Sequence, residues 1–445
     1  FRDHHFDLQR DRAECLFSLV HAETSEAFNP AGSKRINDIF ERPTFFADGT
    51  AGDITQSTTS DNWFLCALAT VSGLPGLIEM LCVARDEGFG VYGFIFFSHG
   101  EWISTVVDDL VRKLWDSTVA GKHLQKMIIH AGEYMHTKAL KNNSDGLYFS
   151  RCHVQNETWL LLLEKVCAKS LGDSEANRKD LRGSEGIEDI TGGVTTELFT
   201  RDLLDPDRFW NEELLQVNKD FLFGCSVQIM ESEGKEQGDC RHTDLHCNLT
   251  YNVLRAVKVN GKRLVFIRNP WGKTAWTDPW SDGSADGTTL EWATALNHRF
   301  GNDGYFWMEF SDFLEEWASI TRSCLFDPSW TVASQWVEVS PIWPAVWGQV
   351  HFVWMRSSLS PVVIVLSQLD TRYFKDLTGP FNFHLQLRIY EEGNESGNWI
   401  GRAFGTPGQR SVNMELDFPA GRYIVYVKID RVLTAAKIDH PLSTS

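Results

Sequence analysis

Residues 56–69 read QSTTSDNWFLCALA, and this stretch decides the fold of the chain. From Asn62 to about Gly73 the sequence is apolar with few breaks, a pattern typical of a buried helix. Asp61 stands just before this run, where its carboxylate can accept the free amide hydrogens of a first helical turn. The stretch therefore predicts a buried helix that begins at Asn62.

Further elements are predicted around this helix. Residues 91–97 are aromatic and branched and predict a strand, which a turn at His99-Gly100 joins to an antiparallel partner at 102–108. Residues 159–170 predict a strongly amphipathic helix. Gly192-Gly193 is the predicted hinge between two domains.

The second half of the chain reads mainly as strands. Residues 221–228, 252–260 and 262–268 predict strands, the last two joined by a tight turn at Asn260-Gly261. From about Phe326 the helical period disappears. Short strands are predicted at residues 330–339, 351–354, 362–366, 383–390 and 422–429. Turn signals separate some of them, which favours a β-sandwich of about a hundred residues.

A second motif lies at residues 268–272, which read RNPWG, followed by Trp276 and Trp280. Together with the spacing of Gln56 and Trp63, this motif resembles the calpain family of papain-like cysteine proteases. Further matching pieces, in the same order as in the family, are GEW at 100–102, VVDD at 106–109, LLLEK at 161–165, GGVT at 192–195, DG at 303–304 and FSDF at 310–313. Because motif claims gain force from such context, the whole series is far more specific than any one piece.

The resemblance spans residues 38–317 and implies an α+β fold, a papain-like protease core of two subdomains followed by a calpain-type β-sandwich. The expected divisions are an N-terminal leader at 1–37, subdomain 1 at 38–192, subdomain 2 at 193–325 and the sandwich at 326–440. The leader is expected to pack onto the larger body, with a short helix at 16–20.

The resemblance also places the first half of a catalytic site. Gln56 matches the glutamine whose side chain donates to the developing oxyanion. Asn62 stands where the family has its nucleophilic cysteine, and Trp63 follows it at the cleft. An amide cannot form a thiolate, which is the attacking species in this chemistry. Ser57 and Ser60 replace glycines that surround the nucleophile in the family.

The second half of the site matches a strand and the RNPWG motif. Asn269 matches the asparagine that orients the catalytic histidine, and Trp271 matches the tryptophan that follows it at the cleft. The histidine itself would stand at Leu249, because Tyr251 and Val253 anchor the register of the matching strand. A leucine side chain cannot accept a proton, so the general base is lost as well.

These two losses favour a catalytically inactive homologue, a pseudoprotease with a binding or regulatory role. A second hypothesis is an active cysteine endopeptidase that uses Cys66, one helical turn beyond Asn62, or His246, three residues before Leu249. A third is a decayed gene product without a selected function. A thiol facing the cleft between the subdomains would favour the second hypothesis.

Calcium is implied by the same resemblance, at one site in each subdomain. The carboxylates of the first site match Asp53 and Glu157, which are both present. The positions of the second site are Ala275, Asp282, Asp303 and Tyr305, so two of four carboxylates are lost. Because calcium needs several oxygen ligands, we expect one calcium site at most, and Asp282 with Asp303 to bind weakly if at all.

The composition of the chain argues against several classes of function. A net charge of −18 argues against sequence-independent nucleic-acid binding, which needs a basic surface. The nine cysteines show no zinc-like spacing, and no apolar run is long enough to span a membrane. These features predict a cytoplasmic protein with reduced thiols. The pseudoprotease hypothesis implies a protein or peptide as its partner.

Overall fold

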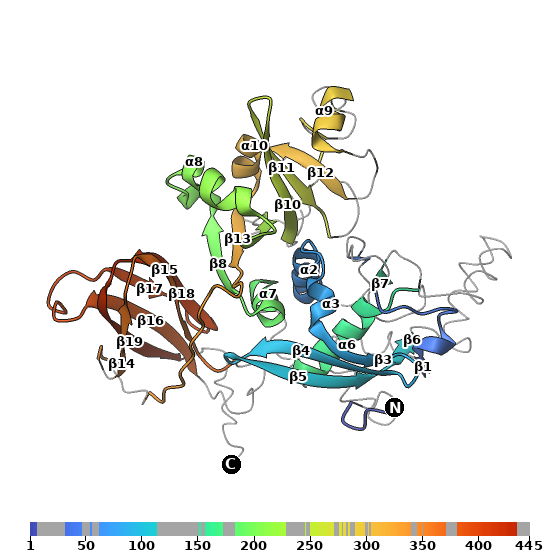
Figure 1. The fold of residues 1–445 in the computed structure, drawn as a ribbon, viewed down its shortest axis with the longest axis horizontal. Helices are drawn as coiled ribbons and strands as arrows, with labels where there is room; N and C mark the ends of the chain where they lie inside the picture. The colour runs from blue at the N-terminus through green and yellow to red at the C-terminus, as the bar shows by residue number, and fades with distance from the viewer. Residues whose placement is uncertain are drawn as a thin grey trace, which may run out of the picture. The chain divides into compact units, whose positions relative to one another are not determined.

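The computed structural model describes most of the chain, in the ranges 1–6, 32–46, 54–55, 62–113, 151–152, 156–171, 183–227, 245, 250–270, 276–277, 279–281, 284, 290–298, 301, 304–339, 345–348, 350–370 and 381–433. The backbone divides into two compact units, Phe1–Ser329 and Trp330–Ser445 (Figure 1). The first unit mixes helices and strands, whereas the described residues after 350 form β-sheets.

The first half of unit 1 packs helices against a sheet of the three strands β3, β4 and β5. Its strands are β1 (Gly32–Arg35), β2 (Ile54–Thr55), β3 (Cys82–Asp86), β4 (Val91–Ser98), β5 (Glu101–Asp108), β6 (Leu110–Lys113) and β7 (Arg151–Cys152). Its helices are η2 (Ile36–Asp38), α2 (Asn62–Val71), α3 (Leu77–Leu81), α6 (Trp159–Leu171) and α7 (Gly183–Thr191). One apolar core joins α2, α6 and α7 to β4 and β5.

The local predictions for this half are confirmed, with one correction. Helix α2 begins at Asn62, and β4 and β5 form a hairpin whose turn residues His99 and Gly100 have positive φ angles of 55° and 84°. Helix α6 lies where it was predicted, but it is not amphipathic. Its charged residues Glu164 and Lys165 are buried together with the leucines before them, because the helix is enclosed on all sides near its centre.

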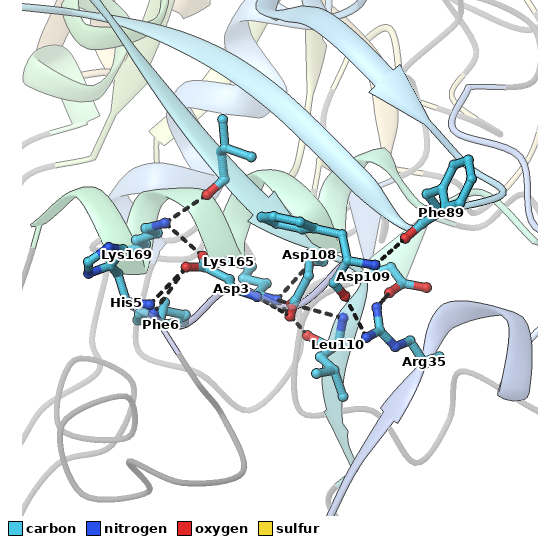
Figure 2. A network of polar contacts seen from close by, with 12 residues as sticks. Asp3, His5, Phe6, Arg35, Phe89, Asp108, Asp109, Leu110, Lys165 and Lys169 are labelled. Carbon is cyan, nitrogen blue, oxygen red and sulfur yellow. Dashed lines mark hydrogen bonds and ion pairs between the residues drawn. The ribbon is translucent and has the colours of Figure 1, made fainter.

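Lys165 is held at the centre of a buried polar network (Figure 2). Its ammonium forms an ion pair with Asp108 and donates hydrogen bonds to the carbonyl oxygens of Asp108 and Leu110, both at 2.8 Å. Burial lowers the pKa of Lys165, while the charge of Asp108 opposes this shift. The VVDD and LLLEK motifs thus meet in one ion pair inside the protein.

The N-terminal residues complete this network. The backbone N–H of Asp3 donates to Asp108 Oδ2 at 2.9 Å, and its carboxylate accepts from Lys169 Nζ at 2.7 Å. Arg35 pairs with Asp109, and β1 pairs with β6. Both described ends of the predicted leader therefore belong to the body of unit 1, while its predicted helix at 16–20 lies outside the described residues.

The second half of unit 1 is built on a sheet in the order β12-β11-β10-β9-β13-β8 among the described residues. Its strands are β8 (Val194–Phe199), β9 (Phe221–Ser226), β10 (Thr250–Val259), β11 (Lys262–Arg268), β12 (Tyr305–Glu309) and β13 (Ser319–Cys324). Its helices are η5 (Thr200–Asp202), α8 (Pro206–Arg208), η6 (Phe209–Glu213), η7 (Leu214–Gln216), α9 (Leu290–Leu296) and α10 (Phe310–Glu316). The predicted turn at Asn260-Gly261 joins β10 to β11, with φ angles of 48° and 81°.

Gly192 and Gly193 connect α7 to β8, at the point where the first half of unit 1 passes into the second. Gly192 has a φ of 66°, and a Cβ added to Gly193 would lie 2.5 Å from the carbonyl oxygen of Cys324. Both positions therefore require glycine for steric reasons, and their role as a hinge stays a prediction.

Unit 2 consists of strands β14 (Val350–Arg356), β15 (Ser360–Ser367), β16 (Phe381–Glu391), β17 (Gly401–Phe404), β18 (Ser411–Phe418) and β19 (Gly421–Leu433). Its described strands form one sheet in the order β14-β19-β16-β17 and a second made of β15 and β18. Apolar side chains of both sheets share one core, which includes Leu387, Val425 and Phe418.

The strand predictions for this region are partly wrong. The strands predicted at 351–354, 362–366, 383–390 and 422–429 are confirmed as β14, β15, β16 and β19. Residues 331–339 form no strand, and their alternating apolar side chains stay largely exposed: Val332 and Trp336 are 69% and 59% exposed. Strands β17 and β18 were not predicted. In the described ranges, no helix is both long and apolar enough to cross a membrane.

Candidate active site

Helix α2 provides the first wall of the candidate site. Asn62 is its first residue, so the position predicted for the nucleophile lies at a helix N-terminus, where the backbone dipole stabilises negative charge. The structure describes the backbone of Asn62 but not its side chain. Gln56, Ser57, Ser60 and the predicted cap Asp61 lie outside the described residues.

Strand β10 lies along α2 and provides the neighbouring wall. Cys66 forms a hydrogen bond with the backbone of Thr250, and four residues later Thr70 Oγ1 donates to Asn252 Oδ1 at 2.5 Å. Because residues four apart share a helix face and residues two apart share a strand face, these two contacts align the helix with the strand. The start of α2 therefore lies beside the start of β10.

The same alignment continues at the other end of α2. A Cβ added to Gly73, two residues beyond the helix, would lie 3.3 Å from Leu254 Cδ2, a tight contact that places the end of α2 close to the strand. Asn218 Nδ2 also donates to the carbonyl oxygen of Leu254 at 2.8 Å. The nucleophile helix and the histidine strand of the family are thus in contact from one end of α2 to the other.

Cys66 is the thiol of α2 nearest to Asn62, and it is buried. Burial raises the pKa of its thiol to about 11, and the hydrogen bond with the backbone of Thr250 lowers it by less. At neutral pH such a thiol stays protonated, whereas reactive cysteines have a lowered pKa and are accessible. The neighbourhood of Cys66 is that of a packing residue.

Trp63 is half-buried and packs inward. Its ring contacts the ring of Phe64, with centroids 5.6 Å apart. A Cβ added to Gly186 of α7 would lie 3.0 Å from Trp63 Cζ3, so a glycine is needed on α7 to accept the indole. These contacts assign Trp63 a packing role between α2 and α7, beside the predicted cleft.

Asn269 directly follows β11 and is fully buried. Its backbone N–H donates to the carbonyl oxygen of Gly304 at 2.8 Å. The register of β10 and β11 pairs Asn252 with Arg268, so Asn269 lies at the end of the sheet where β10 begins. The structure therefore brings together the starts of α2 and β10 and the end of β11. Leu249, His246 and Trp271 lie outside the described residues.

The predicted calcium ligands are described only in part. Glu157 is 6% exposed, and its carboxylate accepts a hydrogen bond from Trp159 Nε1 at 3.2 Å. Tyr305 packs its ring on Phe266 at 5.6 Å and lies under the guanidinium of Arg268 at 5.2 Å. Asp53, Ala275, Asp282 and Asp303 are outside the described ranges. Within those ranges, no group of three His, Cys, Asp or Glu side chains could hold a metal ion.

Sequence reasoning missed the residues that fix this site from within. Thr70 is a polar residue within the apolar run of α2, and Asn252 is a polar residue within β10. These two breaks in the apolar pattern were the signal that could have found them. The two meet across 182 residues of sequence, so no local pattern could pair them. Among the residues that the structure describes, the buried amide nitrogen of Asn252 has no hydrogen-bond partner.

Comparison with known proteins agrees with this arrangement. The family model described as "Calpain family cysteine protease" matches residues 1–324. The chain belongs to this family. Calpain-9 of Mus musculus is 30% identical over 309 residues, which cover 66% of this chain and 39% of that protein.

Other calpains give similar values. The calpain-1 catalytic subunit of Bos taurus is 32% identical over 301 residues, covering 64% of this chain and 37% of that subunit. A calpain-type cysteine protease of Oryza sativa subsp. japonica is 28% identical over 338 residues, covering 72% of this chain and 14% of that protein. The chain thus matches well under half the length of these relatives.

Proposed function

We propose that this calpain-family chain is a pseudoprotease, which keeps the protease fold and binds a protein or peptide without cleaving it. The observation that carries the proposal is the start of α2: the helix begins at Asn62, where the family has its cysteine. A helix N-terminus favours a thiolate, but an asparagine amide has no thiol to ionise.

Cys66 is a poor substitute for the missing nucleophile. Four residues of helix displace it about 6 Å along the axis from Asn62, and attack geometry tolerates little displacement. Its burial and raised pKa also keep the thiol protonated and out of reach of a substrate. These observations favour the pseudoprotease over an active endopeptidase that uses Cys66.

The proposal also includes the loss of the general base, because Leu249 would occupy the position of the family's histidine. Thr250, the next residue, lies against Cys66, which supports placing this end of β10 beside the nucleophile helix. Asn269 would then be retained for packing at the end of β11, where it is fully buried.

The finer architecture belongs to the same proposal. We assign residues 38–192 and 193–325 to two papain-like subdomains and residues 326–440 to a calpain-type β-sandwich. Separate apolar cores support the first division, because one described core lies mainly in the first half of unit 1 and two others lie in its second half. The core shared by both sheets of unit 2 supports the second. The protein is proposed to act in the cytoplasm.

Calcium is proposed at one site, formed by Asp53 and Glu157. Glu157 offers a buried carboxylate with one oxygen held by Trp159, which fits a fixed oxygen ligand. The second site lacks this support, because Tyr305 replaces a carboxylate and its ring is engaged by Phe266 and Arg268. Asp282 and Asp303 alone would supply too few ligands.

A proteolysis assay tests the proposal. Purified chain is incubated with casein, with and without calcium, and compared with a Cys66→Ser variant. We expect no cleavage in any sample. Calcium-stimulated cleavage that disappears in Cys66→Ser would show an active enzyme with a displaced nucleophile. A decayed product without a function would fold poorly, so a cooperative thermal transition in the same preparation counts against that alternative.

A further inference from the structure

The outer face of the four-stranded sheet in unit 2 carries one row of side chains that crosses every strand. The strand registers pair His351 of β14 with Tyr426 of β19, Tyr426 with Arg388 of β16, and Arg388 with Arg402 of β17. Figure 1 shows these strands in unit 2. Two arginines therefore lie directly opposite each other at the β16–β17 end of the row.

Aromatic rings hold both guanidinium groups in place. Arg388 lies over the ring of Trp347 at 4.2 Å from the centroid. Arg402 contacts two rings, Trp399 at 4.8 Å and Phe404 at 5.5 Å. Within the described part of the chain, neither guanidinium forms an ion pair with a carboxylate.

Two other arginines of the described part of unit 2 pair with carboxylates. Arg422 pairs with Glu392, and Arg410 pairs with Asp370 at 3.3 Å. The chain as a whole carries 60 acidic and 42 basic side chains, so carboxylates are abundant. Like charges directly opposite in an antiparallel pair destabilise it, and opposed side chains lie about 5 Å apart at Cβ. An anionic group between Arg388 and Arg402 would reverse this repulsion, since two guanidinium forks match a carboxylate or phosphate well.

Strand β17 also presents a free edge beside these arginines. In the described residues, β17 pairs only with β16 and ends the sheet. Gly405 N–H donates to the carbonyl oxygen of Leu385 at 3.1 Å. Along an antiparallel strand, successive residues point their N–H and C=O groups alternately toward and away from the neighbouring strand. The N–H and C=O groups of Arg402 and Phe404 therefore point away from β16. Ile400 and Phe404 are 44% and 65% exposed beside this edge.

We propose that this edge is the docking site for an extended, acidic segment of a partner protein. The segment would add as a strand to β17, pairing with the free backbone groups of Arg402 and Phe404. An acidic side chain of the segment opposite Arg402 would accept hydrogen bonds from Arg402 and, reaching over β17, from Arg388, and apolar side chains would cover Ile400 and Phe404. This surface is independent of the protease site and goes beyond the proposed pseudoprotease role.

The charge count favours a protein segment over a membrane. Each basic residue near an anionic membrane adds only a small attraction, and typical lipid-binding patches hold about four to eight of them. Two free arginines in a chain of net charge −18 fall well short of that. A single acidic side chain needs no more than two guanidinium groups.

The test uses the full chain and a fluorescein-labelled peptide of eight residues that alternates glutamate with threonine. Fluorescence anisotropy measures binding to the wild type, to Arg402→Ala and to Arg388→Ala. Arg422→Ala is the matched control, because Arg422 lies on the same sheet but already has a carboxylate partner. A second peptide replaces the threonines by proline, which removes backbone donors but keeps the charge.

We expect saturable binding of the peptide to the wild type. Binding should weaken at least about tenfold in Arg402→Ala and in Arg388→Ala, because each loses a guanidinium that donates a charge-assisted hydrogen bond. Binding should stay unchanged in Arg422→Ala. The proline peptide should bind at least about tenfold more weakly. Hydrogen exchange at residues 401–404 should slow when the glutamate peptide is bound.

Three results would overturn the proposal. The first is no saturable binding to the wild type. The second is an equal loss in Arg422→Ala, which would mean a diffuse charge effect. The third is binding to vesicles of equal parts phosphatidylcholine and phosphatidylserine, lost in Arg402→Ala, with no binding to the peptide; the surface would then recognise lipid. Thermal melting of each variant confirms that it is folded.

Discussion

Thr70 of α2 donates a hydrogen bond to Asn252 of β10, at 2.5 Å, with both side chains buried. The same hydroxyl lies 2.9 Å from the carbonyl oxygen of Cys66, so its single hydrogen is shared between the two acceptors. This contact joins the helix that carries the nucleophile position to the strand that carries the histidine position. The loss of this hydrogen bond should strongly lower the stability of the fold, because a buried polar group cannot replace it by a hydrogen bond to water.

Thr70→Val is expected to lower the free energy of unfolding by about 1–3 kcal/mol, because Asn252 then loses its hydrogen bond inside the protein. Thr70→Ser keeps the hydroxyl and should cost less. Urea unfolding followed by circular dichroism measures both. Because only Thr70→Ser loses the methyl group, a loss in Thr70→Ser that equals or exceeds that in Thr70→Val would contradict the weight given to the hydrogen bond.

Asp108→Asn is expected to lower the free energy of unfolding by about 3–5 kcal/mol, since it leaves the Lys165 ammonium buried without its counter-charge. Adding Lys165→Met should restore part of that stability, because the uncompensated charge is removed. Urea unfolding of the three proteins measures the coupling. A double variant that is less stable than Asp108→Asn would contradict the importance of the charge.

Cys66 is expected to make stability depend on pH in the alkaline range. Its pKa is about 11 in the folded state and 9.0 when unperturbed, so the folded protein binds the extra proton between these values. The stabilisation is complete below pH 9 and is lost as pH rises toward 11, by about 3 kcal/mol at most.

Unfolding of the wild type and of Cys66→Ala at a series of pH values checks this expectation. The wild type should lose more stability than Cys66→Ala between pH 9 and 11. Cys225, whose pKa burial also raises, is present in both proteins and so cancels in the comparison. Parallel curves would mean that Cys66 titrates normally and is accessible.

Calcium titration calorimetry of the chain should show one site at most, lost in Asp53→Ala and in Glu157→Gln. Both variants remove a proposed carboxylate ligand. Asp312→Asn serves as a control, because Asp312 belongs to helix α10 and to neither proposed site. Two sites of similar affinity would show that Asp282 and Asp303 bind calcium despite Tyr305.

Much of the fold could be predicted because its signals are local. The apolar run after Asn62, the β4–β5 hairpin and the Asn260-Gly261 turn each depend on a few adjacent residues. The strand predicted at 330–339 failed, because alternation alone does not supply a neighbouring strand. Lys165 was read as part of a helix, and its pairing with Asp108 was missed because 57 residues separate them.

The candidate site, too, could be predicted only where its signals are local. Motif order alone led to the prediction that Asn62 and Leu249 replace a cysteine and a histidine, and this stays a prediction. The environment of Cys66 could not be predicted: its contact with Thr250 and its burial depend on how α2 lies along β10. Only the folded chain shows that this thiol is packed.

The most direct test of the account is labelling by a peptidyl epoxide that alkylates activated thiolates, measured as intact mass at neutral pH. The wild type should gain no label, and Asn62→Cys combined with Leu249→His should gain one label at position 62, faster than Asn62→Cys alone. The helix N-terminus and an imidazolium together lower the pKa of the new thiol. Labelling of the wild type at Cys66, or an added histidine without any effect on the rate, would contradict the account.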